Sequence, residues 1–356
     1  MSKRFIVKTT FALSCLFTNQ ALANANHAVI EAAGHAPIGV MGDHMHKSGE
    51  FMLSYRVMAM HMSDNLQGSS SISPDTIVTQ VTNPFANPPM SPPTVRVVPK
   101  NMQSTMHMLG LMYAPNNDVT IMAMLNLIRR DMSLTTYQGG MGTNVLSDFD
   151  TQSTGLGDTK IALLYNLFGN TAHRVHANVG WIIPTGSIEK SDEVLTPMSM
   201  RTTLRLPYSM QTGNGSHQAE IGLTYNGSTE QVSWGAQILH QQAFGRNSER
   251  WQIGNLNQLS GWLAYAWSAA FSSSVRLTYR HSDQIEGFDQ KITAPVTTAN
   301  PENYGGHNLL VGVGINGVLA EKHRLGLELQ IPLNYQVNGI QMDLDSMLTL
   351  GYQIAF

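Results

Sequence analysis

The sequence predicts an all-β protein: a single transmembrane antiparallel β-barrel of about 12 strands, with long extracellular loops and short periplasmic turns. Three observations lead to this fold class. Apolar residues recur at every second position, in segments long enough for a tilted strand to cross a bilayer. Charged residues make up only 13 % of the chain, compared with about 25 % in soluble domains. The connections alternate between short and long, which is typical of outer-membrane barrels.

The first 23 residues have the features of a secretory signal peptide. Lys3, Arg4 and Lys8 form a positive region, residues 11–17 form a short apolar region, and Ala21 and Ala23 suit a small-x-small cleavage site. We therefore expect residues 1–23 to direct export to the outer membrane of a bacterial cell. The only cysteine, Cys15, lies in this peptide, so cysteine nucleophiles and cysteine zinc sites are excluded from the mature chain.

Residues 24–48 precede the first predicted strand and are expected to form a periplasmic N-terminal segment that contains histidine and methionine. Asp43, His44, Met45 and His46 stand together in it. Thioether sulfur selects soft ions such as Cu(I) and Ag(I), and imidazole also suits Cu(II). The cluster is thus a candidate metal site at the periplasmic entrance, and a solvated tail that binds nothing is the alternative.

The remaining residues, 49–356, are predicted to form the barrel. In the first strand Phe51, Leu53 and Tyr55 alternate with Met52 and Ser54, and the other segments follow the same rule. Twelve segments are predicted as strands: 50–62, 104–113, 119–132, 158–168, 174–184, 217–227, 231–243, 258–268, 273–282, 307–316, 323–333 and 347–356. An even number of strands places both termini on the periplasmic side.

The order of the connections supports closure. Tight turns are expected near 114–118, 169–173, 228–230, 269–272 and 317–322, and longer polar loops near 63–103, 133–157, 185–216, 244–257, 283–306 and 334–346. A β-sandwich is not expected to sort its connections in this way. Closure gives every backbone group a partner in lipid. The expected partners are the outer-membrane lipids and the barrel assembly machinery, which reads the terminal strand and its last residue, Phe356.

Methionines gather in the first three predicted strands, on the face opposite the more apolar one. If the apolar face meets lipid, these methionines line the lumen as one patch, because cross-strand neighbours lie about 5 Å apart. The patch can bind Cu(I) or Ag(I), or it can be flexible packing or an apolar surface for solutes. Its members are Met52, Met58, Met60, Met106, Met108, Met112, Met122 and Met124.

Six charged residues fall on the same predicted lumen face. Such charges tune selectivity in a pore, and they also keep a lumen polar, so the two interpretations overlap. They are Arg56, Arg276, Arg280, Arg324, Glu220 and Glu328.

Other classes of function are disfavoured. The chain has 21 Lys and Arg against 24 Asp and Glu and no basic stripe, so we expect no nucleic-acid partner. No nucleophile, base and orienting group are marked as a set, so we expect no enzyme.

Five motifs resemble a known family. They are residues 41–47 (MGDHMHK), 153–160 (STGLGDTK), 184–187 (PTGS), 206–211 (LPYSMQ) and 348–356 (LTLGYQIAF). Together they resemble the outer-membrane barrel family labelled "MetA-pathway of phenol degradation", which is transporter-like, over nearly the whole mature chain. The resemblance implies a barrel with a transport role, and it brings no catalytic residues.

The sequence therefore predicts an outer-membrane transporter or channel for a small solute, an apolar or aromatic compound. One alternative is a barrel that handles copper or silver through methionine thioethers and histidine. A further alternative is a non-transporting barrel that is structural or sequesters metal. No cofactor is certain, and Cu(I) or Ag(I) is the candidate.

Overall fold

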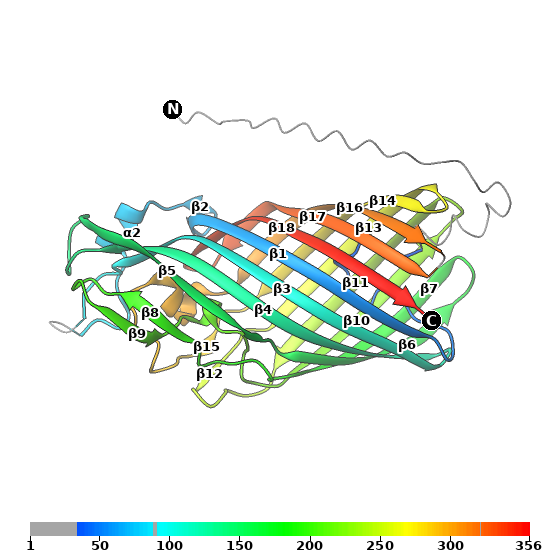
Figure 1. The fold of residues 1–356 in the computed structure, drawn as a ribbon, viewed down its shortest axis with the longest axis horizontal. Coiled ribbons are helices and arrows are strands. Elements are labelled where there is room, and N and C mark those ends of the chain that lie inside the picture. The colour runs from blue at the N-terminus through cyan, green and yellow to red at the C-terminus, as the bar shows by residue number, and fades with distance from the viewer. Residues whose placement is uncertain (1–33, 88–90, 321) are drawn as a thin grey trace.

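A computed structural model describes residues 34–87, 91–320 and 322–356, and it forms a closed antiparallel β-barrel (Figure 1). Hydrogen bonding runs through 12 consecutive strands, and β18 returns to pair with β1, so the barrel has no free edge. The strands of this circuit are β1 (Phe51–Gln67), β3 (Val97–Asn116), β4 (Val119–Tyr137), β6 (Thr159–Gly169), β7 (His173–Ile183), β10 (Gln218–Ser228), β11 (Val232–Ala243), β13 (Leu256–Ser268), β14 (Phe271–Ser282), β16 (Gly306–Leu319), β17 (His323–Val337) and β18 (Ile340–Ala355). The predicted fold class is confirmed.

The two faces of each strand differ as the alternation predicts. On β1, Phe51, Leu53 and Tyr55 are exposed on the outside, whereas Met52 and Arg56 are buried in the lumen. Rings gather on the outside near the C-terminus, where Phe51 stacks between Tyr113 and Phe356. An aromatic band at the barrel rim is a feature of strands that meet a membrane interface.

The two ends of the barrel are built differently. Tight turns join strands at one end, such as β3 to β4 and β13 to β14. The long connections gather at the other end, on the left of Figure 1. They contain β2 (Ser70–Ser71), α2 (Pro74–Gln80), β5 (Val145–Leu156), β8 (Ser191–Leu195), β9 (Arg201–Arg205), η1 (Tyr208–Met210), β12 (Trp251–Gln252), β15 (Glu286–Gly287), η2 (Thr297–Ala299) and η3 (Pro301–Asn303). No helix in the described ranges is long and apolar enough to cross a membrane.

The long connections pack against one another at their end of the barrel. Trp251, Tyr208, Leu206 and Ile292 are buried in one hydrophobic core that also includes Met132 of β4. Ser73 caps α2 by accepting a hydrogen bond from the Thr76 backbone N–H, and the helix buries Ile77 and Val78. The loops therefore form a cap with a core of its own.

Several predicted boundaries are wrong: β1 continues to Gln67 and β4 to Tyr137, and the expected loop 133–157 contains the strand β5. Two further loops differ most. Residues 334–346 were expected to form a long loop, but β17 continues to Val337 and β18 begins at Ile340, so a tight turn joins them. The expected first loop, 63–103, also ends too late, because β3 begins at Val97. That strand accommodates Pro99 at a register shift before Asn101, where a missing N–H costs least.

Candidate functional site

The described part of the N-terminal segment lies inside the barrel. We call residues 34–48 the plug. Its backbone bonds to side chains that point inward from four different strands, so it crosses the lumen at the end where the tight turns lie. These bonds are Arg324 Nη2 to the Ala36 carbonyl (2.6 Å), the Gly39 N–H to Glu328 Oε2 (2.9 Å), Gln237 Nε2 to the Met41 carbonyl (3.0 Å), Asn226 Nδ2 to the Asp43 carbonyl (2.7 Å) and the His46 N–H to Thr120 Oγ1 (3.1 Å).

Small residues in the barrel wall make room for the plug. Gly326 of β17 and Gly351 of β18 face each other across the ladder. A Cβ on either glycine would lie within 2.7 Å of the Ile38 side chain. Ile38 is only 1 % exposed, and burying a side chain of this size contributes about 1.5–3 kcal/mol. The segment predicted as periplasmic thus has its described residues in the lumen, and residues 24–33 lie outside the described ranges.

A cavity of about 490 Å³ occupies the middle of the lumen, and Gly39 and Met41 of the plug form part of its lining. One wall is rich in thioethers. It is formed by Met58 of β1, Met106 and Met108 of β3, Met124 of β4 and Met347 of β18. Met58 and Met106 are direct cross-strand partners. This wall offers a flexible, polarisable, apolar surface.

The facing wall is mostly polar, although Ile182, Leu239, Leu256 and Leu310 also contribute to it. Lys160 of β6 pairs with Glu220 of β10, and Arg276 of β14 pairs with Glu328 of β17 at 2.8 Å. Arg280 also lines the cavity, and no carboxylate in the described chain lies within ion-pairing distance of it. The lining therefore carries an unbalanced positive charge opposite the methionine wall.

A second cavity, of about 230 Å³, lies toward the loop cap. It is again rich in methionine, and Tyr304 and Tyr335 also line it. Arg130 of β4 lines both cavities, and its Nη1 donates to the Gln211 carbonyl. Arg130 therefore marks the boundary between the two spaces. The methionines of the second cavity are Met60, Met62, Met102, Met132 and Met342.

The eight methionines predicted as one patch lie at three levels of the lumen. Met58, Met106, Met108 and Met124 line the central cavity, and Met60 lines the second one. Met52, Met112 and Met122 are instead packed against Ala162 and Leu164, and Met45 of the plug packs against this group.

The six predicted pore charges all face the lumen. Arg56, Arg276, Arg324, Glu220 and Glu328 are buried, and Arg280 is partly exposed to the cavity. Three of them bond to the plug: Glu328, as described above, and also Arg324 and Arg56. Arg324 donates to the Ala36 carbonyl, and Arg56 Nη1 donates to the Met41 sulfur.

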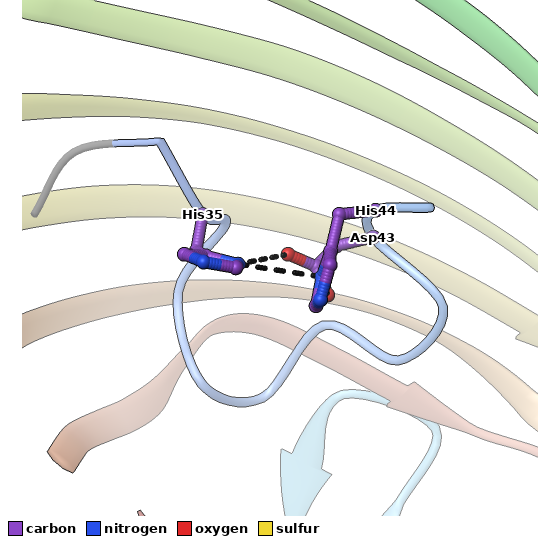
Figure 2. Close-up of side chains that lie close together, drawn as sticks. All are labelled: His35, Asp43 and His44. Carbon is purple, nitrogen blue, oxygen red and sulfur yellow. Dashed lines mark hydrogen bonds and ion pairs between the residues drawn. The ribbon is translucent and has the colours of Figure 1, made fainter. Parts of the chain in front are cut away.

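The predicted metal residues are only partly together. His44 Nδ1 lies 2.9 Å from Asp43 Oδ1 and 3.3 Å from Nδ1 of His35, a residue outside the predicted cluster. The His46 ring centroid lies 4.9 Å from that of His44. Figure 2 shows His35 facing Asp43 and His44 across the loop that the plug makes. Met45 points into the methionine group described above, so it is separate from these imidazoles.

Burial and charge perturb the titratable groups of the plug. Burial alone would raise the pKa of Asp43, but the attraction and hydrogen bond of His44, with His35 and Arg324, bring it well below its usual range. Burial, followed by repulsion from Arg324 and His44, lowers the pKa of His35. Burial and the nearby His44 lower the pKa of His46 to about 4. Asp43 is therefore ionised and His35 and His46 are neutral at pH 7.

Some residues of the site were missed by sequence reasoning. Arg130 and Lys160 occupy inward positions of β4 and β6, so strand parity applied to every charged residue would have found them. No such signal exists for His35, because it lies in an irregular segment and meets Asp43 and His44 only when the plug turns back on itself.

Comparison with solved structures supports the fold. The chain is similar to the COG4313 outer membrane channel from Pseudomonas putida F1, with a TM-score of 0.58 and 12 % identity over 90 % of this chain and 100 % of that one. Further matches are the Pseudomonas putida toluene transporter TodX (TM-score 0.43, 10 % identity, 92 % and 97 % covered) and the NanC porin (TM-score 0.42, 7 % identity, 85 % and 98 % covered). No protein-family model matches the sequence, and no curated protein matches it. The fold is therefore that of an outer-membrane barrel.

Proposed function

We propose that the protein is a non-enzymatic channel of the bacterial outer membrane for small organic solutes with an apolar, often aromatic, body and one polar or anionic group. The observation that carries this proposal is the central cavity of about 490 Å³, which has a methionine wall opposite a polar wall with surplus positive charge. A cavity of this size suits a small organic molecule. The resemblance to the barrel family associated with phenol degradation supports a transport role and does not specify the solute.

The methionine wall suits the apolar body. Met58, Met106 and Met108 expose thioethers that make favourable contacts with aromatic rings, about 0.3–1.5 kcal/mol each. Their flexible side chains adapt to rings of different shape, and none of them forms a strong directional bond that would trap a solute.

The opposite wall suits the polar group. Arg280 reaches the cavity without a carboxylate partner among the described residues, and guanidinium binds carboxylates in a two-pronged geometry. Gln218, Gln237 and Gln241 add amide donors and acceptors to the same lining. We infer that a hydroxyl or carboxylate on the ring faces this wall.

Two alternatives from the sequence have less support. Handling of Cu(I) or Ag(I) in the plug by Met45 together with histidine requires the two ligand types to meet, whereas Met45 and the plug imidazoles occupy different environments. A non-transporting barrel predicts a protein that stays electrically silent even after the plug is removed.

The test uses the refolded protein in planar bilayers. We expect discrete conductance steps, which grow larger when residues 24–47 are deleted. In the deleted form, benzoate and phenol should reduce the ionic current reversibly. Arg280→Met should weaken the block by benzoate much more than the block by phenol, because it removes charge and keeps the apolar stem.

Arg129→Met is the matched control for the charge, because Arg129 is the outward neighbour of Arg130 and pairs with Asp131 on the surface. It should leave both solutes unaffected. A folded, plug-deleted protein that shows no conductance would refute the channel. Equal effects of the two arginine substitutions on benzoate would refute the assignment of the polar wall.

A further inference from the structure

We propose that His35, Asp43 and His44 bind one divalent transition-metal ion of the Zn²⁺ or Cu²⁺ class, and that this ion fastens the plug inside the barrel. The proposal goes beyond solute passage. Metal binding at this site does not depend on the proposed channel function. Only the expected effect of the ion on conductance rests on that function.

Three ligand atoms already converge from the two arms of the plug loop (Figure 2). His35 Nδ1 lies 3.3 Å from His44 Nδ1 and 3.9 Å from Asp43 Oδ2, and His44 Nδ1 lies 2.9 Å from Asp43 Oδ1. Tetrahedral bonds of about 2.0–2.1 Å place neighbouring ligand atoms about 3.3 Å apart. The observed separations involve both oxygens of Asp43 and lie on either side of that value, and one ligand atom from each residue lies within 4.8 Å of the other two, so side-chain movements bring the three residues onto one ion.

The donors select the kind of ion. Two imidazole nitrogens and a carboxylate oxygen suit Zn²⁺ and Cu²⁺, whereas Cu(I) and Ag(I) prefer sulfur. The nearest thioether of the plug in sequence, Met45, packs against Met52, Met112 and Met122 instead. His35 and His44 are half-buried and Asp43 is only 3 % exposed, so the carboxylate in particular is shielded from water.

His46 is the candidate for a fourth ligand. His46 is buried, its ring centroid lies 4.9 Å from that of His44, and its Nε2 has no hydrogen-bond partner in the described chain. Nε2 of His44 is likewise buried without a partner. Buried polar atoms of this kind normally find a partner, so His46 is available to complete the coordination, and a water molecule is the other choice.

Two positively charged side chains near the site repel a bound cation, so removing one of them should change the metal affinity. Arg324 and Arg56 act on the Asp43 carboxylate from the barrel wall. Their guanidinium groups bond elsewhere, to the Ala36 carbonyl and the Met41 sulfur, so the carboxylate keeps its contact with His44. Removing the charge of Arg56 should therefore tighten metal binding at this site and at no other.

The position of the three residues gives the ion a mechanical role. His35 stands before the part of the plug that covers the cavity floor, and Asp43 and His44 follow it. Between them in sequence lie Ile38, which packs against Gly326 and Gly351, and Gly39, whose backbone N–H donates to Glu328. An ion bound by both arms closes this loop and holds the segment across the lumen.

The binding test is a Zn²⁺ titration of the refolded full-length mature protein against a competing chelator, repeated with Co²⁺, whose visible absorbance reports tetrahedral coordination. We expect one ion per chain. The double variant His35→Ala/His44→Ala and the single variant Asp43→Asn should each weaken binding by at least about tenfold. Arg56→Gln should strengthen it by at least about threefold.

His61→Ala is the matched control, because His61 forms an exposed pair with Asp345 at 3.8 Å on the outside of the barrel. It should leave the Zn²⁺ affinity unchanged. Asp43→Asn keeps the shape of the side chain, so it serves if the double variant fails to fold. Absence of saturable binding, or binding that these substitutions do not reduce, would overturn the site.

The gating test compares single-channel conductance with Zn²⁺ and with chelator. We expect the ion to keep the channel closed and the chelator to open it, and neither should affect Asp43→Asn. If Zn²⁺ binds at the site but leaves conductance unchanged, the fastening role is wrong while the metal site stands. If the plug-deleted protein is itself silent, the failure lies with the channel function.

Discussion

The backbone N–H of Gly39 donates a 2.9 Å hydrogen bond to Oε2 of Glu328, the carboxylate that also pairs with Arg276. A Cβ at residue 39 would lie 2.3 Å from that oxygen and 2.4 Å from Arg276 Nη2. The plug thus rests directly on an ion pair of the barrel wall, and only glycine allows so close an approach.

Gly39→Val should displace the plug without altering a strand. The added side chain collides with two groups that hold each other in place, so the segment must move away from the wall. We expect larger single-channel conductance in planar bilayers and unchanged strand content by circular dichroism. Gly140→Ala, in a loop with space for a Cβ, is the control. Conductance equal to that of the wild type would contradict the role of Gly39.

Glu328→Gln should destabilise the barrel by about 3 kcal/mol, because it leaves the Arg276 charge buried without compensation. Urea unfolding in lipid vesicles, followed by tryptophan fluorescence, measures the change in free energy of unfolding. Replacing both partners with Arg276→Met and Glu328→Leu should recover most of the loss. Glu193→Gln breaks an exposed pair with Arg201 and should cost less than about 1 kcal/mol.

Arg130→Ala should join the two lumen cavities, because this side chain lines both. Measured in the Gly39→Val background, where the plug is displaced, the conductance should rise further. Arg129→Ala removes the same charge from the outer face of the same strand, where it pairs with Asp131, and should have no effect. Equal conductance for the two variants would show that Arg130 is not the barrier.

The loop cap should weaken in acid through Glu249. Hydrogen bonds from Lys291 and Arg205 lower the pKa of Glu249 to about 2, from 4.5. Because the folded pKa is the lower one, the contribution to stability is complete above about pH 4.5 and is lost as the pH falls toward 2. Cleavage of the loops by pepsin, normalised to an unstructured peptide, should therefore rise across this range.

Glu249→Gln provides the comparison for this pH dependence. The variant cannot titrate at residue 249, so its loops should be cleaved more readily at pH 4.5, and cleavage should change less between pH 4.5 and pH 2. Glu193→Gln, whose ion pair is exposed, should behave like the wild type. Parallel curves for wild type and Glu249→Gln would exclude this ion cluster as the acid-sensitive element.

Strand parity explains why the sequence predicts correctly which side chains of the site face the lumen. Once a strand is recognised, a period of two residues assigns every side chain to lipid or lumen, which is why Met58, Arg276 and Glu328 are found on the predicted side. The ends of the strands are predicted less accurately than their faces. Polar residues such as Asn334 and Asp343 resemble loop residues, yet they extend β17 and β18 beyond the apolar band, where water replaces lipid and no longer demands apolar residues.

Periodicity predicts which face of the barrel a side chain lies on, but it does not predict which residues that side chain contacts. The predicted methionine patch is distributed between open cavities and a packed group because the plug occupies one level of the lumen. Among the described residues Arg276 has a carboxylate partner and Arg280 has none, although both have the same parity on β14. Which carboxylate an arginine meets depends on the register between strands and on the plug, and neither is contained in one strand's pattern.

The amino-acid pattern is sufficient to specify the barrel, because alternation, strand length and the order of short and long connections are local properties that only closure satisfies in lipid. It also determined which charges and thioethers face the lumen. What occupies the lumen depends instead on long-range contacts in the folded chain. Residues 34–48 have no period, and their place follows from contacts with strands far away in sequence, such as that of Ile38 with Gly351. His35, Asp43 and His44 meet only because those contacts turn the chain back on itself.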